Sequence, residues 1–309
     1  MSNLCFIFPG QGSQYAGMGK ALFDRYEIAR STYKKADDIL GYSLSSVCFE
    51  GPEEELRKTG NTQPGIFVIS AIVQTILKDA GIKPLATAGH SLGEYSALYA
   101  AGCLSFEDAL HLVIERGKAM NKASESRKGS MAAVIGLNVS RINEICGNVA
   151  DKGIVQIANI NSPNQLVITG DSEAVKIAMG KAKEAGASRV IPLSVHGAFH
   201  SPLMEEAASR MKDVLGGVNI QEPEIPFVNN ADAAFLTDPE SIRDSLIRQV
   251  TSCVRWVACM EKLMELEPRG MVEAGPGKVL AGLGRRIAKD LEIYPCETPE
   301  QIEKIAHAQ

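Results

Sequence analysis

A serine between glycines is the residue best suited to covalent chemistry in this chain. Residues 89–93 read Gly-His-Ser-Leu-Gly, which is a G-x-S-x-G pattern. A short apolar run precedes the pattern and a stretch of small residues follows it. This context predicts a nucleophile elbow, in which Ser91 occupies a sharp strand-to-helix turn and glycines permit close backbone approach. The simpler alternative is a Gly-rich turn that holds a serine by chance, since short motifs have many chance matches.

A serine hydroxyl is a poor nucleophile without a base beside it. The chain has five histidines. His90 adjoins the serine, and we expect its side chain to point away from that of Ser91. His111 falls within a predicted helix, and His307 lies near the C-terminus. The residues alone therefore leave two candidates for the base, His196 and His200, which share one loop.

The acid of a Ser-His-Asp triad is not evident. No Asp or Glu lies in a clear loop after a strand between Ser91 and His200, where α/β-hydrolases place it. A backbone or amide carbonyl can orient the imidazole instead, because the orienting group need only fix the tautomer. This gap argues against an ordinary hydrolase triad.

Two further side chains suit the binding of an acyl group. Arg116 lies on the helix predicted after the elbow helix, and its fork can bind a carboxylate through two parallel hydrogen bonds. The alternative for Arg116 is a solvated helix residue or a partner of Glu115 or Glu107. Gln11 lies in the loop after the first predicted strand, and this loop can complete an oxyanion hole with the N–H of Leu92. The alternative there is a Gly-rich turn with solvated amides.

The hydrophobic periodicity predicts the elements that must position these residues. Strands are predicted at residues 4–8, 85–88, 131–137, 155–159, 165–169, 188–195, 225–229, 270–274 and 293–296. Helices are predicted at residues 18–39, 63–79, 94–101, 105–120, 140–150, 172–185, 202–215, 241–265 and 278–289. Ser105 is expected to cap the helix that it begins. Strands that alternate with helices predict an α/β fold with a mostly parallel sheet covered on both faces.

The rhythm of the elements changes within residues 128–197. Their β-α-β-β-α-β order matches the ferredoxin-like split motif. We therefore predict a small ferredoxin-like subdomain, 128–197, inserted into a large α/β-hydrolase-like domain formed by residues 1–127 and 198–309. The loop with His196 and His200 returns from the insert to the large domain, so a base on this loop can reach a cleft between the two parts.

The composition excludes several classes of function. The net charge is −5 and there is no basic block, which argues against nucleic acid as the main partner. No run approaches eighteen apolar residues and the N-terminus has no basic region, so neither a membrane span nor a signal peptide is expected. Seven scattered cysteines without a C-x-x-C pair argue against a disulfide framework or a zinc site. These features predict reduced thiols and a cytoplasmic location.

Seven segments, in order along nearly the whole chain, resemble the acyltransferase family of bacterial malonyl-CoA:acyl carrier protein transacylases and of fatty acid and polyketide synthases. They are residues 8–14, 89–95, 116–117, 159–163, 197–201, 248–249 and 273–277. The resemblance implies that Ser91 is the acylated nucleophile and that His200, rather than His196, is its base. It also implies that the Gln249 position supplies a carbonyl that orients the histidine, which fills the gap left by the missing acid.

The resemblance also implies a substrate site. Arg116 would bind the malonyl carboxylate, and Gln11 with the Leu92 N–H would hold the oxyanion. Asn161 and Phe199 would contact the substrate. The segment 197–200, Gly-Ala-Phe-His, is similar to that of malonyl-selective members, whereas methylmalonyl-selective members carry a smaller residue where Phe199 stands.

The implied reaction is ping-pong transfer of a malonyl group from malonyl-CoA to the phosphopantetheine thiol of acyl carrier protein. The implied partners are a coenzyme A thioester and acyl carrier protein. No metal or redox cofactor, nucleic acid or membrane is implied, and a monomer is expected. There are three alternatives. A trans-acting polyketide synthase acyltransferase differs in its carrier partner, and a serine hydrolase or thioesterase has no need of an Arg for a carboxylate. A non-catalytic carrier-docking protein would be expected to have lost Ser91 or His200, and both are present.

Overall fold

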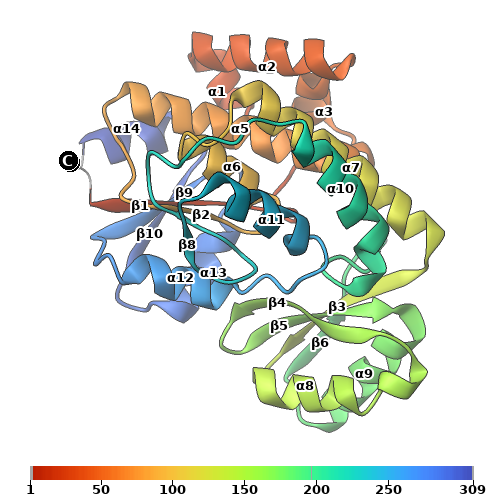
Figure 1. Ribbon diagram of the computed structural model, residues 1–309. Helices are drawn as coiled ribbons and strands as arrows, with labels where there is room; N and C mark the ends of the chain where they lie inside the picture. Colours follow the sequence, from red (N-terminus) through yellow and green to blue (C-terminus); the bar gives the residue numbers. More distant parts are fainter. Residues whose placement is uncertain (1–2, 196, 308–309) are drawn as a thin grey trace.

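A six-stranded sheet forms the centre of the larger part of the molecule (Figure 1), in the order β10-β9-β1-β2-β7-β8. The computed structural model describes residues 3–195 and 197–307. Within them, β10, β9, β1, β2 and β7 pair in parallel, and β8 pairs antiparallel to β7. The strands are β1 (Leu4–Phe8), β2 (Thr87–Gly89), β7 (Phe227–Val228), β8 (Phe235–Leu236), β9 (Gly270–Ala274) and β10 (Glu292–Cys296).

Helices cover both faces of this sheet, which is why all five residues of β1 are buried. Successive side chains of a strand point to opposite faces, so Phe6 and Phe8 join the core under α5 while Cys5 and Ile7 join the core under α12 and α13. The helices of this part are α1 (Lys20–Arg25), α2 (Glu27–Leu40), α3 (Leu44–Glu50), α4 (Glu53–Arg57), α5 (Thr59–Asp79), α6 (Gly93–Ala100), α7 (Phe106–Ser126), η2 (Pro202–Met204), α10 (Glu205–Gly216), α11 (Pro239–Gln249), α12 (Trp256–Met264), α13 (Val279–Ile287) and α14 (Pro299–His307).

A second sheet of four antiparallel strands forms a smaller subdomain, in the lower part of Figure 1. Its order is β4-β5-β3-β6, with the two helices α8 and α9 packed on one face. The other face turns its apolar side chains, such as Met131 and Val167, into the core of the large part. The elements are β3 (Gly129–Ile135), α8 (Val139–Gly147), η1 (Ala150–Lys152), β4 (Val155–Ser162), β5 (Gln165–Asp171), α9 (Ser172–Glu184) and β6 (Arg189–Pro192).

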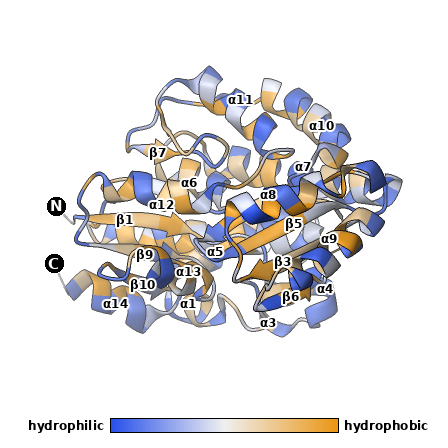
Figure 2. Cartoon of the chain, turned by 90° about the horizontal axis from the view of Figure 1, so that it is seen from below, coloured by the Kyte–Doolittle hydropathy of each residue, from blue (hydrophilic) through white to orange (hydrophobic). Residues whose placement is uncertain are grey.

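The predicted fold class is confirmed: a mostly parallel sheet between helices carries a small antiparallel subdomain with β-α-β-β-α-β order. Apolar residues concentrate on the strands of both sheets, and polar residues on the outer faces of the helices (Figure 2). The proposed domain limits, 1–127 with 198–309 and 128–197, stay a prediction. Among the residues described, no helix combines the length and the apolar character needed to cross a bilayer.

Some predicted elements were wrong. The predicted helix 18–39 is divided at Tyr26, whose backbone is extended, and α3, α4 and α14 were not predicted. The predicted helix 241–265 is divided into α11 and α12. The intervening backbone bonds to the edge of β4 instead: Val254 N–H donates to Ala158 O at 2.8 Å, and Ile160 N–H to Val254 O at 3.0 Å. The predicted strand 155–159 ends later than expected, because β4 continues through a bulge to Ser162.

Candidate active site

Ser91 lies in the strand-to-helix turn that its flanking glycines predict. Its φ is 53°, in the left-handed region that L-residues seldom adopt. The turn is packed so closely that a Cβ on Gly89 would lie 1.8 Å from Gly93 O, and one on Gly93 would lie 2.1 Å from Phe8 O. Only glycine fits at either position, so the two glycines hold β1, β2 and α6 together beneath the serine.

His200 is the histidine beside the serine. The Ser91 Oγ lies 2.8 Å from His200 Nε2, and His200 Nδ1 lies 2.9 Å from Gln249 O. A carbonyl only accepts, so Nδ1 carries the proton and Nε2 is left to accept from the serine hydroxyl. Burial, and then the charge of Arg116, lower the pKa of His200 to about 3, which keeps the imidazole neutral. His196, the other candidate, lies outside the described residues.

The carbonyl of Gln249 is available because α11 ends at that residue. The last four carbonyls of a helix have no partner within it. Had the predicted helix continued through residues 250–255, a helical N–H would have occupied this oxygen. The break that sequence reasoning missed is thus the feature that lets a backbone carbonyl orient the histidine.

Arg116 is buried in α7, with 1% of its surface exposed, and points at the serine. Its Nη2 donates to Ser91 Oγ at 3.1 Å and to Gln249 Oε1 at 3.0 Å, while Nη1 donates to Gln63 Oε1 at 3.0 Å. The guanidinium also lies over the ring of Tyr95, 5.8 Å from its centroid. A buried guanidinium that faces neutral acceptors is poised to take an anionic ligand.

The simpler interpretation of Arg116, as a solvated helix residue or an ion-pair partner, is wrong. Glu115 pairs with Lys118 and Arg210 instead, and Glu107 pairs with Lys35. Burial lowers the pKa of Arg116, but an arginine stays charged in proteins.

A cavity of about 150 Å³ opens in front of these groups, between the large part and the small subdomain; we call it the Ser91 cavity. Of the eight residues to which the family resemblance assigns a role, seven line this cavity, and Gln249 lies behind its wall. The lining residues are Gln11, His90, Ser91, Leu92, Arg116, Met120, Met131, Asn159, Asn161, Val167, Leu193, Val195, Phe199 and His200. Strands β3, β4 and β5 of the subdomain therefore form one wall, and the elbow forms the other.

The elbow offers one backbone donor to this cavity. Leu92 occupies the N-cap position of α6, where an N–H has no acceptor within the helix. The N–H of Ser91 is already taken, since it donates to Asn230 Oδ1 at 2.7 Å. Gln11 reaches the same cavity from the loop after β1, whereas Gln14 accepts from Gly12 N–H and does not line it.

Sequence reasoning missed several polar residues of the site. His90 was expected to point away from the serine, yet it lines the same cavity, with its Nε2 2.8 Å from Asn161 Oδ1. Asn230 follows β7 and ties the elbow together, because its Nδ2 donates to Gly89 O at 2.7 Å. Its place after a parallel strand was the available signal, since loops at the carboxyl ends of such strands meet at one edge. Glu94 is fully buried in α6, and its carboxyl accepts from Gln249 Nε2.

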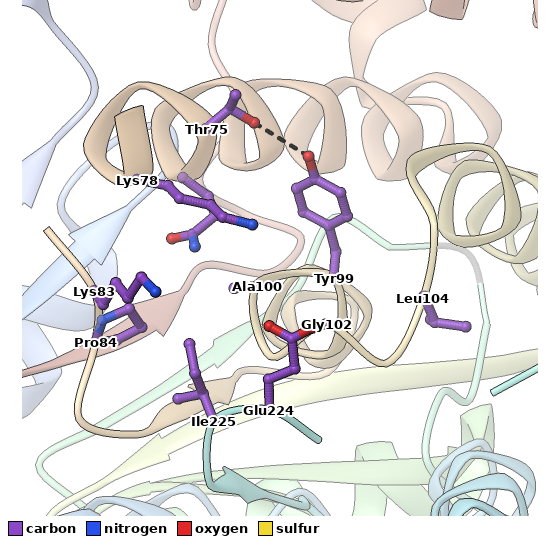
Figure 3. Close-up of a pocket in the computed structure, with 11 residues that line it drawn as sticks. Thr75, Lys78, Lys83, Pro84, Tyr99, Ala100, Gly102, Leu104, Glu224 and Ile225 are labelled. Atoms are coloured by element: carbon purple, nitrogen blue, oxygen red, sulfur yellow. Dashed lines mark hydrogen bonds between the residues drawn. The ribbon is translucent and has the colours of Figure 1, made fainter. Parts of the chain in front are cut away.

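A larger pocket of about 270 Å³ lies at the opposite edge of the sheet (Figure 3). We call it the Lys78 pocket. It is lined by Gln74, Thr75, Lys78, Lys83, Pro84, Tyr99, Ala100, Gly102, Leu104, Glu224 and Ile225. The Thr75 and Tyr99 hydroxyls lie 3.1 Å apart there, and Lys78, Lys83 and Glu224 are exposed. The pocket contains no serine or cysteine beside a histidine, so the nucleophile and base are found together only in the Ser91 cavity among the pockets described here.

No cluster of His, Cys, Asp and Glu suited to a metal ion occurs in residues 3–195 and 197–307. All seven cysteines are free, and burial raises the pKa of Cys5 and Cys48 to about 12. Such thiols are not ionised at neutral pH, so they are poor rivals to Ser91 as nucleophiles.

The chain is similar to known acyl transferases over nearly its whole length. The acyl transferase domain family matches residues 5–300. The chain is 43% identical to the malonyl CoA-acyl carrier protein transacylase of Bacillus subtilis, over 98% of this chain and 96% of that protein. It is 41% identical to the protein of the same name from Escherichia coli, over 97% of each.

Solved structures agree with these matches. The acyl-carrier-protein S-malonyltransferase of Bartonella henselae superposes with a TM-score of 0.96 at 42% identity, over 100% of this chain and 99% of that one. A malonyl-transacylase solved in complex with a type II polyketide synthase acyl-carrier protein superposes with a TM-score of 0.97 at 39% identity, over 100% of both chains.

Proposed function

Because the chain belongs to the acyl transferase domain family, we propose that the Ser91 cavity is the place where it transfers malonyl groups. The chain is an acyltransferase that moves a malonyl group from malonyl-CoA to acyl carrier protein. The observation that carries the assignment of the site is the placement of three groups around one oxygen: Ser91 Oγ lies 2.8 Å from the His200 imidazole and 3.1 Å from the Arg116 guanidinium.

In the first half-reaction, Ser91 Oγ attacks the thioester carbonyl of malonyl-CoA and gives its proton to His200 Nε2. The oxyanion that forms accepts hydrogen bonds from the Leu92 N–H and from Gln11. The carbon–sulfur bond then breaks, and His200 returns the proton to the departing sulfur. Coenzyme A leaves with a neutral thiol, and the malonyl group remains as an ester on Ser91.

In the second half-reaction, the phosphopantetheine thiol of acyl carrier protein enters the same cavity. His200 accepts the thiol proton while the sulfur attacks the ester, and it returns this proton to Ser91 Oγ as the ester bond breaks. The low pKa of His200 suits both halves, because the imidazole begins each one neutral. Each step is a proton transfer or an acyl substitution, so we propose that no metal or redox cofactor takes part.

Arg116 is assigned to the malonyl carboxylate. Its guanidinium is buried and faces neutral acceptors only, so a carboxylate that enters the cavity gains a charged partner already in place. Phe199 and Asn161 line the space left for the rest of the acyl group. A thioesterase or other hydrolase has no use for such an arginine, and it would be expected to supply the acidic residue that is missing beside His200.

We further propose that the chain acts as a monomer in the cytoplasm. The monomer is supported by the site itself, because every group assigned a role comes from one chain. The location is supported by the free cysteines, which suit a reducing compartment. The acyl-transfer chemistry is the same for a carrier protein of fatty acid synthesis and for one of a polyketide synthase. Measuring turnover with each carrier protein shows which of them the chain serves.

The mass of the intact protein after incubation with malonyl-CoA tests this proposal. We expect one malonyl adduct, which disappears when acyl carrier protein with its phosphopantetheine is added. The Ser91→Ala variant should form no adduct, and Ser96→Ala, on the helix that follows Ser91, should form it as the natural protein does. An adduct that maps to a cysteine would overturn the assignment of the nucleophile.

A further inference from the structure

Glu94 is a buried carboxyl that the mechanism above does not use. It lies in α6, three residues after the nucleophile, and none of its surface is exposed. Its Oε2 accepts from Gln249 Nε2 at 2.5 Å, and its Oε1 accepts from the Asn230 N–H at 3.4 Å. Burying a carboxyl away from water costs free energy unless its hydrogen bonds compensate, so its presence here points to a role for those hydrogen bonds.

The hydrogen bonds around Gln249 show what this carboxyl does. A guanidinium only donates, so Gln249 must turn its Oε1 toward Arg116. Its Nε2 then faces the other way and donates to Glu94 Oε2 and, at 2.8 Å, to Ser91 O. Glu94 therefore fixes the side-chain amide of Gln249, which in turn holds the Arg116 guanidinium beside the serine. The backbone carbonyl of the same Gln249 orients His200.

The charges near Glu94 leave it poised between two states. Burial raises its pKa to about 8, opposed by the hydrogen bonds from Gln249 and Asn230 and by the positive charge of Arg116 on α7. Asp232, in the loop after β7, raises the pKa further. The charge of Glu94 also acts on two other titratable groups, Tyr95 on the same helix and the Cys259 thiol on α12. Burial raises the pKa of both, so they stay uncharged. Arg116 is the cation whose charge lowers the pKa of this carboxyl.

We propose that Glu94 is a positioning residue for Gln249 and Arg116, and that its negative charge and the carboxylate of an arriving malonyl group exclude one another. This inference rests on the proposed role of Arg116 in binding the acyl carboxylate. Two buried carboxylates near one guanidinium repel each other, so malonyl enters most readily when Glu94 is protonated. By linkage, a bound malonyl group raises the affinity of Glu94 for its proton.

Two consequences can be measured. The ratio of kcat/KM for malonyl-CoA to kcat/KM for acetyl-CoA should fall as the pH rises through the pKa of Glu94, because only malonyl carries the competing charge. Acylation by malonyl-CoA at about pH 8 should also take up more protons than acylation by acetyl-CoA, by up to about half a proton per enzyme, since a group at its pKa is half ionised. The thiol of coenzyme A is released in both reactions and cancels in both comparisons.

The decisive experiment measures this malonyl-to-acetyl ratio between about pH 6.5 and about pH 9 for the natural protein, Glu94→Gln and Ser96→Ala. Glu94→Gln keeps an oxygen that accepts from Gln249 and removes the charge. Ser96 is the matched control, because it is buried on the same helix and its hydroxyl has no hydrogen-bond partner in the described part of the chain.

We expect the ratio to fall by about threefold or more across this range in the natural protein and in Ser96→Ala, and to stay constant in Glu94→Gln. A ratio that falls equally in Glu94→Gln would overturn the inference. Proton uptake is measured on the natural protein alone, so it decides the matter even if Glu94→Gln does not fold; equal uptake with both substrates would also overturn it. If Arg116→Ala lowers malonyl transfer and acetyl transfer by the same factor, the proposed role of Arg116 fails instead.

Discussion

The Ser91 cavity and the Lys78 pocket lie at opposite ends of the same strands. Ser91 follows the carboxyl end of β2, whereas Lys83 and Pro84 precede its amino end (Figure 3). Helix α6 begins beside the first and ends beside the second, and α5 contributes Gln63 to the site of Arg116 and Lys78 to the pocket. The two regions thus share their framework and differ in what surrounds their charged groups.

In the Ser91 cavity, His200 and Arg116 are buried and both bond to the half-buried Ser91, so their charges act at short range in a medium of low polarity. In the Lys78 pocket, Lys78, Lys83 and Glu224 are exposed residues, and charges near the surface are screened by water and salt. The pocket has the larger volume, about 270 Å³ against about 150 Å³. The comparison teaches that desolvation and hydrogen bonding, rather than the size of a hollow, mark where chemistry can take place.

Loss of the base should have the largest effect in the Ser91 cavity. His200→Ala is expected to lower the rate of acylation by about 10²–10⁴-fold, which is the usual contribution of a general base. Rapid mixing with malonyl-CoA followed by quenching and mass measurement gives this rate. His196→Ala is the matched control and should be much milder; if the two variants rank in the reverse order, the assignment taken from the family resemblance is wrong.

Loss of the arginine fork should have the next largest effect, and a selective one. Arg116→Ala is expected to lower malonyl transfer by at least about tenfold, because truncating one partner of a buried charge pair typically removes about 2–5 kcal/mol of binding. Acetyl transfer should stay equal or improve, since acetyl has no carboxylate to bind. Steady-state kinetics with both thioesters measure the ratio.

Arg116→Lys sharpens this test, because an ammonium cannot reproduce two parallel hydrogen bonds and should restore malonyl transfer only in part. An equal loss for malonyl and acetyl in Arg116→Ala would mean that the residue supports the fold or contacts coenzyme A.

The parts of the site that are local in sequence could be predicted. The elbow follows from its glycines and the flanking apolar and small residues, and the Ser105 cap follows from a three-residue spacing; its Oγ accepts from Asp108 N–H at 3.0 Å. The subdomain was also predictable, since its strand and helix periods alternate regularly.

The non-local features could not be predicted from local patterns. The end of α11 at Gln249 depends on β4 offering backbone partners to residue 254, about one hundred residues earlier in the chain. The burial of Arg116 depends on Gln63 and Gln249, which come from two other helices. Only the resemblance to a family singled out Gln249 and decided between the two histidines, because spacing and periodicity carry no signal for either.

A smaller effect should appear in the pH dependence of stability. The pKa of His200 is near 3 when folded and about 6.5 when unfolded, so the unfolded chain binds the additional proton and stability is lost as the pH falls below about 6.5. Glu94 acts in the opposite direction, because its raised pKa favours the folded state as the pH falls from about 8 toward 4.5. Comparison with a variant of His200 isolates the contribution of this histidine to the unfolding free energy.

We expect the unfolding free energy of His200→Asn to rise relative to that of the natural protein as the pH falls. The difference should grow by up to about 1.4 kcal/mol for each pH unit below about 6.5. Urea unfolding at a series of pH values measures the difference, in which the contribution of Glu94 cancels. Parallel curves for the two proteins would show that the imidazole is not held neutral by burial.

The smallest effects are expected in the Lys78 pocket. Lys78→Ala and Glu224→Ala should change malonyl transfer by less than about twofold, because substitutions of solvated surface charges usually alter free energies by only about 0.5 kcal/mol or less. Steady-state kinetics with malonyl-CoA and acyl carrier protein check this, with Arg116→Ala as the positive control on the shared framework. A loss of about tenfold or more in either pocket variant would break the comparison. It would mean that α5 or α6 transmits changes at the amino ends of the strands to Gln63 or to the elbow, and the two regions would then be one functional unit.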